Sequence, residues 1–471
     1  MTLMSSIFEE KLRSNLSPSC FPTSSEKYFH DPRGQLGFLG LVIAPEKVDE
    51  VSFILSNCNQ ERVPVVPYGG GTGLVKGQLF SGMNRPVIIS LERMKKIRGV
   101  YPNENTLVAE AGAILSDVKA AARKVDRLFP LSIAAEGSAR IGGNLATNAG
   151  GTNVLRYGNT RDLCLGLEVV FPDGRILSDL SRLRKNNTGY DIKNLLIGSE
   201  GTLGIITAAT LKLAPQPAKE GTAFFVIPSP KEALSLLSLA RTYLGENIST
   251  FELIHRQGLE FLQEKIPDVR IPFAELPEWV VLIDIGVPRH FDPIAILIDL
   301  YEEGQNTQIV SNGWIAQSQR ERDQFWSVRE HIPEANRKIG AISTHDISVP
   351  ITMIPEFVSS ANKEMVKLGD FRVNCFGHIG DGNLHYDIFP AHGKTREYYQ
   401  DIEACIQKVV YDLVTDMEGS ISAEHGIGRL KVKELECYCD STKLAVMKQI
   451  KQTVDPNGIM NPGAVISCET C

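Results

Sequence analysis

The chain has 471 residues, a formal net charge of −7 and nine cysteines. This length allows two or three domains, and mixed charge without a basic block argues against nucleic acid as a partner. The cysteines form no evenly spaced framework, and no apolar run reaches the ~20 residues that span a bilayer. The N-terminal residues lack the pattern of a signal or transit peptide. We therefore expect a cytoplasmic protein, with peripheral attachment at the inner membrane as an alternative.

Up to about Pro215, short strand-like runs alternate with helical patterns. Strands are predicted at 64–68, 86–91, 106–112, 165–171 and 203–213, and helices at 46–61 and 114–125. The prolines within 213–219 indicate a domain boundary, because proline stops strand pairing. Later helices are predicted at 230–245, 325–338, 354–369 and 441–456. Mixed with strands, they indicate a second α+β domain.

A glycine-rich loop follows the first predicted strand, in VPVVPYGGGTGLVKG at 63–77. Such loops bring main-chain N–H groups close to phosphate, because no Cβ stands in the way. A Walker loop is excluded by the residues after Gly73, and a Rossmann fingerprint by Lys76. Only about ten residues separate Gly73 from the next strand, too few for a parallel crossover. The loop therefore binds an anion in another fold, or it is a flexible turn.

Two further glycine clusters favour the ligand-binding interpretation. They lie at 136–163, EGSARIGGNLATNAGGTNVLRYGNTRDL, and at 194–207, NLLIGSEGTLGIIT. Each cluster adjoins a predicted strand, so the three together suit a long ligand that contacts main chain along its length better than they suit linkers.

Two histidines flank a turn-prone centre in FGHIGDGNLHYD at 376–387. If Gly-Asp-Gly-Asn closes a four-residue turn between strands, His378 faces His385, and opposed Cβ atoms lie about 5 Å apart. Both rings could then hold one metal ion. The alternative is an ordinary hairpin with two surface histidines.

The cysteines at the C-terminus form one further motif. Cys468 and Cys471 make a terminal C-x-x-C pair, with Cys437 and Cys439 nearby. A single pair without a second is weak evidence for zinc, and loosely held thiols are the favoured interpretation.

Together these motifs carry a family resemblance over roughly residues 35–466. The chain resembles the FAD-linked oxidases and dehydrogenases of the vanillyl-alcohol-oxidase type, in the D-lactate, glycolate-oxidase and D-2-hydroxyglutarate dehydrogenase branch. The matching motifs are YGGGTG, IGGNLATNAGG, YGNTRDL, GSEGTLGIIT, GHIGDGNLH, SAEHGIG and MNPG.

The resemblance implies an α+β fold with an FAD-binding domain of the p-cresol methylhydroxylase (PCMH) type, built from two small α/β subdomains. It also implies an α+β substrate cap and a helical C-terminal return to the flavin. The expected ranges are 1–34 for a helical lead-in, 35–215 for the FAD domain, 216–415 for the cap and 416–471 for the C-terminal segment.

By the same resemblance, the glycine clusters bind FAD. The first loop would cradle the pyrophosphate, and residues of the second and third clusters would line adenosine and flavin. Asn461 would close over the isoalloxazine edge. These residues are Tyr68, Gly69, Gly70, Gly71, Thr72, Gly73, Leu74, Gly142, Gly143, Asn144, Thr147, Asn148, Ala149, Gly150, Gly151, Ile205, Ile206 and Asn461. Covalently flavinylated relatives carry a histidine in the first loop, which this chain lacks, so FAD is expected to be non-covalent.

Glu424 and His425 are adjacent and therefore point to different faces, so one metal would most easily take only one of them. The resemblance implies that His378, His385 and Glu424 bind zinc or a similar divalent ion, and that His425 is the base. Two nitrogens and one carboxylate leave positions open to substrate. An imidazole accepts a proton at physiological pH.

The resemblance also selects substrate contacts. Arg329 follows a Trp as the family's carboxylate-binding Arg does, although a lone helical Arg is usually a solvated charge. Thr344 stands where close relatives carry a Lys, and Asp387 where 2-hydroxyglutarate enzymes carry an Asn. Both departures predict a preference for monocarboxylic acids such as D-lactate, or for acids with a neutral, hydroxylated or cationic tail.

The expected function is FAD-dependent oxidation of a D-2-hydroxy acid to the 2-oxo acid, with hydride transfer to flavin N5. The alternatives are the FAD subunit of a glycolate oxidase complex and a non-catalytic electron-transfer subunit. A quinone, an electron-transfer flavoprotein or a cytochrome would accept the electrons. A homodimer is the candidate oligomer.

Overall fold

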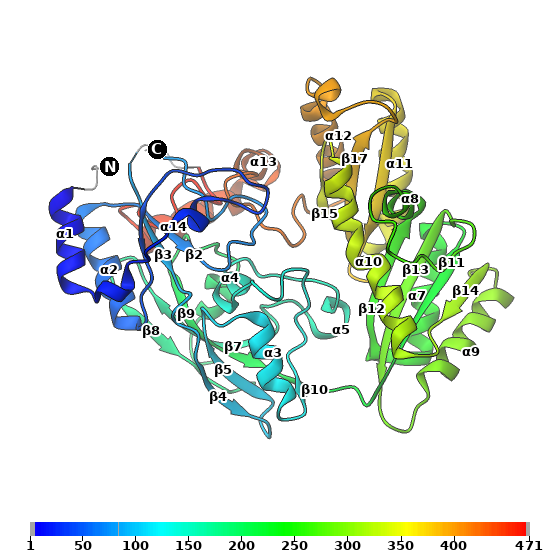
Figure 1. Cartoon of the computed structure of the whole chain (residues 1–471), viewed down its shortest axis with the longest axis horizontal. Coiled ribbons are helices and arrows are strands. Elements are labelled where there is room, and N and C mark those ends of the chain that lie inside the picture. The colour runs from blue at the N-terminus through cyan, green and yellow to red at the C-terminus, as the bar shows by residue number, and fades with distance from the viewer. Residues whose placement is uncertain (1–4, 83, 468–471) are drawn as a thin grey trace. The chain divides into compact units, whose positions relative to one another are not determined.

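The computed structural model describes residues 5–82 and 84–467, so Cys468 and Cys471 lie outside the described residues. The chain forms two compact units (Figure 1). Unit 1 comprises Met1–Gly150, Gly158–Gln216 and Glu424–Cys471, and unit 2 comprises Gly151–Tyr157 and Pro217–Ala423. Within the described ranges, no helix is long and apolar enough to cross a membrane.

Unit 1 contains two main sheets. A parallel sheet has the order β1-β3-β2, and an antiparallel sheet has the order β4-β5-β9-β7-β8. Their strands are β1 Leu41–Ile43, β2 Val65–Tyr68, β3 Val87–Ser90, β4 Ile97–Tyr101, β5 Thr106–Glu110, β7 Cys164–Val170, β8 Ile176–Asp179 and β9 Ile205–Lys212. A short pair joins β6 Arg127–Leu128 to β10 Ala214–Pro215. The helices are α1 Ser6–Asn15, α2 Val48–Glu61, α3 Leu115–Arg123, α4 Ile141–Ala146, α6 Ile192–Leu196, α13 Val432–Tyr438 and α14 Ser441–Val454.

Unit 2 is built on one sheet with the order β14-β11-β13-β12-β16-β17-β15. The strands are β11 Lys219–Ile227, β12 Ile248–His255, β13 Trp279–Val287, β14 Asn312–Ile315, β15 Asp346–Ser348, β16 Phe371–Gly377 and β17 Asn383–Pro390. Its helices are α5 Val154–Tyr157, α7 Pro230–Leu244, α8 Arg256–Lys265, α9 Pro293–Asn306, α10 Gln319–Ile339, α11 Ile354–Leu368 and α12 Glu403–Asp416.

Helices cover both faces of the unit 2 sheet, and the side chains that alternate along β11 are apolar on both faces. Phe224 packs in a core cluster with Phe325 of α10, at a ring distance of 5.0 Å. Its neighbour Phe225 stacks on Tyr301 of α9, at 5.8 Å. Successive strand residues point to opposite faces, so an uninterrupted apolar run is needed where both faces are buried.

The predicted strands and helices are confirmed as elements at these positions. Their ends differ by at most two residues, except that the helix predicted to begin at 325 begins at Gln319. The exclusion of a parallel crossover after the first glycine loop was wrong. β2 pairs with β3 in parallel, Val65 opposite Val87. The connection spans residues 69–86, and its described residues form no helix. Counting from the strand end at Tyr68 rather than from Gly73 makes the connection long enough for a parallel crossover.

The histidine hairpin exists, but its predicted register was wrong. His385 pairs with Phe376, not with His378, and the connection spans 378–382. Asn383 belongs to the strand because it pairs with Ser348 of β15, and its side chain donates to Ile347 O at 2.9 Å.

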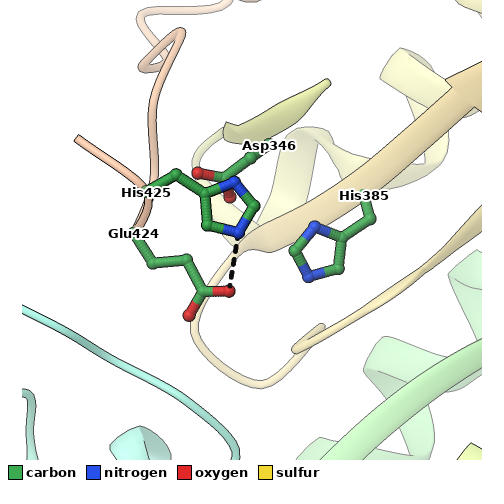
Figure 2. A group of neighbouring side chains, drawn as sticks. All are labelled: Asp346, His385, Glu424 and His425. Atoms are coloured by element: carbon green, nitrogen blue, oxygen red, sulfur yellow. Dashed lines mark ion pairs between the residues drawn. The ribbon is translucent and has the colours of Figure 1, made fainter. Parts of the chain in front are cut away.

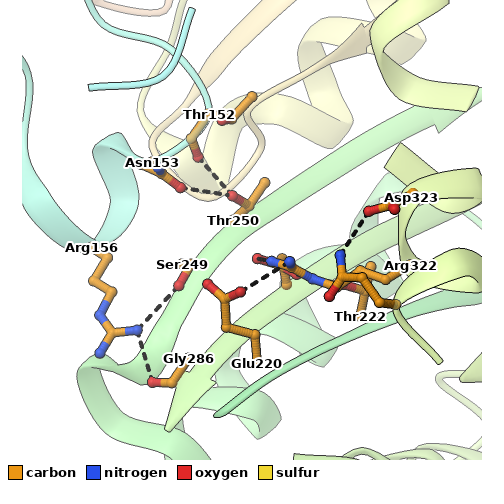
Figure 3. A network of polar contacts seen from close by, with 12 residues as sticks. Thr152, Asn153, Arg156, Glu220, Thr222, Ser249, Thr250, Gly286, Arg322 and Asp323 are labelled. Atoms are coloured by element: carbon orange, nitrogen blue, oxygen red, sulfur yellow. Dashed lines mark hydrogen bonds and ion pairs between the residues drawn. The ribbon is translucent and has the colours of Figure 1, made fainter. Parts of the chain in front are cut away.

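Residues 151–157 lie within the second glycine cluster and pack on the unit 2 sheet (Figure 3). Arg156 donates to Ser249 Oγ (3.1 Å) and to the carbonyl of Gly286 (2.8 Å). Thr250 Oγ1 donates to the carbonyl of Thr152 at 3.0 Å. These bonds join the segment to β12 and β13 by polar contacts from both of its ends.

Candidate active site

The three glycine clusters meet inside unit 1. A Cβ on Gly69 would lie 3.3 Å from the Cα of Gly143, and one on Gly201 would lie 2.7 Å from the Pro67 ring. The Glu200 N–H donates to the carbonyl of Ala146 at 2.7 Å. Main chain from all three clusters therefore comes together at one place, as one ligand bound by all three would require.

Asn144 provides a test of whether these loops fit FAD. Asn144 is 5% exposed, and its Nδ2 has no hydrogen-bond partner among the described residues. A buried amide donor without a partner is costly, and an acceptor on a ligand would satisfy it. Together with loops in which glycines allow close main-chain approach, this donor fits an extended ligand rich in acceptors such as FAD.

The other residues expected around the cofactor are arranged mainly by contacts within unit 1. Thr147 Oγ1 donates to the carbonyl of Gly143 at 3.0 Å, and Asn148 Oδ1 accepts from the N–H of Arg161 at 2.9 Å. Ile205 and Ile206 are buried at the start of β9. Residues 69–74 of the first loop are half-buried.

Asn461 and the preceding C-terminal stretch are held on the glycine loops. The Asn461 side chain donates to the carbonyls of Gly77 (3.1 Å) and Glu200 (2.8 Å) and accepts from Arg429 (2.6 Å). The Glu200 carboxylate accepts from the N–H groups of Ile427 (2.8 Å) and Gly428 (2.7 Å). Burial raises the pKa of Glu200 in spite of these donors.

A second group of side chains has the composition of a metal site (Figure 2). One ligand atom from each of Asp346, His385, Glu424 and His425 lies within 4.8 Å of all the others. Asp346 is 4% exposed, and the other three are half-buried. His425 Nε2 lies 3.6 Å from Glu424 Oε1. Two imidazoles and two carboxylates fit zinc and similar divalent ions.

The chain itself brings Glu424 to Asp346. Glu424 directly follows Ala423, whose N–H donates to the main-chain oxygen of Asp346 at 3.3 Å. Nearby, Ser348 and Ser420 form an antiparallel bridge. The residues leading into SAEHGIG thus run beside β15, next to the strand that carries His385.

His378 lies outside that group of four and is bound to a buried carboxylate. Its ring centroid is 5.9 Å from that of His385, and its Nδ1 contacts Glu252 Oε1 at 2.5 Å. Glu252 Oε2 accepts from Nε of Arg329 at 2.7 Å. Burial alone would raise the pKa of Glu252, but the charges and hydrogen bonds of Arg329 and His378 lower it to about 2.

The two residues that depart from the family pattern lie in different environments. Thr344 is exposed in the segment before β15. Asp387 is 8% exposed, two residues after His385 in β17, so its side chain lies on the same face of the sheet. Its carboxylate accepts from Asn336 and from the His345 N–H, each at 3.2 Å.

Sequence reasoning missed two carboxylates, Asp346 and Glu252. Each is an acidic residue in a strand next to apolar or small residues, in DIS and TFELI. A charged residue in such a strand is rarely buried without a partner, so its presence there is the signal that could have found both.

Comparisons with known proteins agree with this architecture. Residues 40–179 match the family model described as FAD binding domain, and residues 216–465 match FAD linked oxidases, C-terminal domain. A mitochondrial D-2-hydroxyglutarate dehydrogenase of Arabidopsis thaliana is 36% identical over 94% of this chain and 77% of its own length. A D-2-hydroxyglutarate–pyruvate transhydrogenase of Saccharomyces cerevisiae is 33% identical over 96% and 91%.

The solved structure of p-cresol methylhydroxylase with substrate bound shares the fold. Its TM-score is 0.73 with 14% identity, over 98% of this chain and 96% of that one. The chain therefore belongs to the FAD-linked oxidases, and it is an FAD-dependent oxidoreductase. The fold implied by the sequence motifs is confirmed.

Proposed function

We propose that the protein oxidises a D-2-hydroxy acid to the corresponding 2-oxo acid, with FAD and a divalent metal ion, zinc in the first instance. The observation that carries the proposal is the group of Asp346, His385, Glu424 and His425. An electron-transfer subunit without a substrate has no use for such a group. Two relatives whose names contain D-2-hydroxyglutarate support the substrate class.

The residues divide into metal ligands and a base. His378, His385 and Glu424 would hold the ion, with Asp346 as a further candidate ligand. When bound, a divalent ion makes a coordinated hydroxyl more acidic, and FAD accepts a hydride. His425, next to Glu424, would take the hydroxyl proton, because a positioned imidazole is an effective base near neutral pH.

Arg329 would bind the substrate carboxylate. Its side chain is 7% exposed, its guanidinium lies 5.0 Å from the Phe376 ring, and its Nε is bonded to Glu252. Its two terminal nitrogens would bind the carboxylate, which an Arg fork can hold with two hydrogen bonds.

The charges of the residues near His385 indicate which substrate side chains the site would accept. Asp387 adds a buried carboxylate on the His385 face of β17, and Thr344 supplies no cation. Two like unit charges 4 Å apart repel by roughly 4 kcal/mol at an effective dielectric of 20. A monocarboxylic acid such as D-lactate, or one with a neutral, hydroxylated or cationic tail, should therefore be preferred over a dicarboxylic acid.

Turnover with an artificial electron-accepting dye tests the proposal. D- and L-enantiomers of several 2-hydroxy acids are offered to the purified holoprotein, and the 2-oxo acid is identified as a product. We expect oxidation of D-enantiomers that is lost in His385→Ala. Equal rates for L-enantiomers, or a His385→Ala variant of full activity, would contradict the proposal.

A further inference from the structure

A carboxylate lies at the centre of the unit 2 sheet without exposure to solvent. Glu252 is 0% exposed on β12, which pairs with β13 on one side and β16 on the other. An ion removed from water costs several kcal/mol, so a residue of this kind needs partners of opposite charge or strong hydrogen bonds.

Both partners of Glu252 carry roles in the proposed function. Oε1 contacts His378 Nδ1 at 2.5 Å, and Oε2 accepts from Arg329 Nε at 2.7 Å. These partners come from separate elements, because His378 lies in the β16–β17 connection and Arg329 in α10. One rigid carboxylate thus fixes a ring and a guanidinium that are 49 residues apart in sequence (378 − 329).

The contact with Glu252 fixes the tautomer of the His378 ring. A carboxylate can only accept, so the Nδ1 of His378 must donate. In the neutral imidazole this places the lone pair, which can bind a metal ion, on Nε2. Carboxylates that hold the far nitrogen of a histidine ligand fix its tautomer and orientation in metal sites generally.

The contact with Arg329 orients the guanidinium in the same way. Bonding at Nε, with the Phe376 ring 5.0 Å from the guanidinium carbon, restricts rotation of the fork. The terminal nitrogens then point in a fixed direction at little further entropic cost when a carboxylate binds.

We propose that Glu252 is a positioning residue that presents His378 Nε2 to the metal and the Arg329 fork to the substrate carboxylate. This inference rests on the proposed function. It joins two subsites through one side chain, so a single substitution should weaken both.

Zn²⁺ affinity of the FAD-loaded protein, measured by competition with a chelator, is the main readout. In Glu252→Gln, the amide can donate to Nδ1 and so favour the tautomer with its proton on Nε2. We expect affinity to fall about 10–100-fold, as for other residues behind a metal ligand. Glu252→Asp keeps the negative charge, so its Zn²⁺ affinity should fall less than that of Glu252→Gln. KM for the best hydroxy acid should rise at least threefold in Glu252→Gln.

Asp284 supplies a matched control. It is a 4% exposed carboxylate on the adjacent strand β13, paired with Arg322 at 3.0 Å. Asp284→Asn removes a buried ion pair of the same sheet and should leave Zn²⁺ affinity unchanged. An equal loss in Asp284→Asn would show a general structural effect and overturn the inference.

The two readouts, Zn²⁺ affinity and KM, test the two halves of the inference separately. Unchanged KM in Glu252→Gln would overturn its Arg329 half. A wild type that binds no Zn²⁺ contradicts the proposed metal site as well. A wild type that binds it, with Glu252→Gln equally tight, contradicts this inference alone.

Discussion

A Cβ on Gly70 would lie 2.2 Å from the carbonyl oxygen of Ser138. This approach places the first glycine loop directly against the start of the second glycine cluster. Main chain, rather than side chains, therefore shapes this part of the expected cofactor site.

Gly70→Ala should displace one loop from the other. We expect a loss of about 1–3 kcal/mol in unfolding free energy, typical of overpacking, together with lower FAD content. Thermal unfolding and flavin absorbance per protein measure both. Gly137→Ala is the control, because its Cβ would meet nothing within 4 Å. Equal behaviour of the two variants would contradict the close approach.

FAD should be released completely when the protein is precipitated with acid. The loop Gly69–Gly73 contains no histidine, and Thr72 offers no nitrogen for a covalent bond. The absorbance of the supernatant and of the redissolved pellet measures the partition. Yellow colour that stays with the denatured chain would refute non-covalent binding.

His385→Ala should abolish bound metal and most turnover while leaving FAD in place, because His385 is a proposed ligand and belongs to the group formed with Asp346, Glu424 and His425. His378→Ala is expected to do the same. Metal content by elemental analysis and FAD by absorbance distinguish the effects. The exposed His392 gives a neutral control in His392→Ala. Full activity of metal-stripped wild type would show that the paired histidines are structural.

His425→Ala should keep the metal and lose rate, by ~10²–10⁴-fold for removal of a general base. Turnover and metal content are measured on the same preparation. Loss of the metal together with the rate would assign His425 to the ion, and the division between Glu424 and His425 would be wrong.

Thr344→Lys combined with Asp387→Asn should shift substrate preference toward dicarboxylic acids. The two changes remove a negative charge and add a positive one, so a second substrate carboxylate is repelled less. The comparison is kcat/KM for D-lactate against D-2-hydroxyglutarate in both proteins. A wild type that prefers the dicarboxylate tenfold or more would contradict the proposed pocket.

Local features of the sequence predicted the elements and the glycine loops well, because strand, helix and turn preferences act over a few neighbouring residues. The register of the histidine hairpin was missed, since Asn383 is drawn into β17 by pairing with β15, a strand formed 35 residues earlier (383 − 348). Glu252 and His378 are 126 residues apart, and no spacing rule predicts such a contact. Long-range pairing, which local pattern does not encode, therefore explains both misses.

Anaerobic mixing of the FAD-loaded protein with D- and L-2-hydroxy acids tests the central claim most directly. Without an acceptor, oxidation of a substrate must leave its two electrons on the flavin, which loses its yellow absorbance. We predict bleaching by D-enantiomers, fastest with monocarboxylic acids, and slowed at least 100-fold in His425→Ala. Flavin that stays oxidised with every D-2-hydroxy acid, or that is bleached equally by L-enantiomers, would contradict the account.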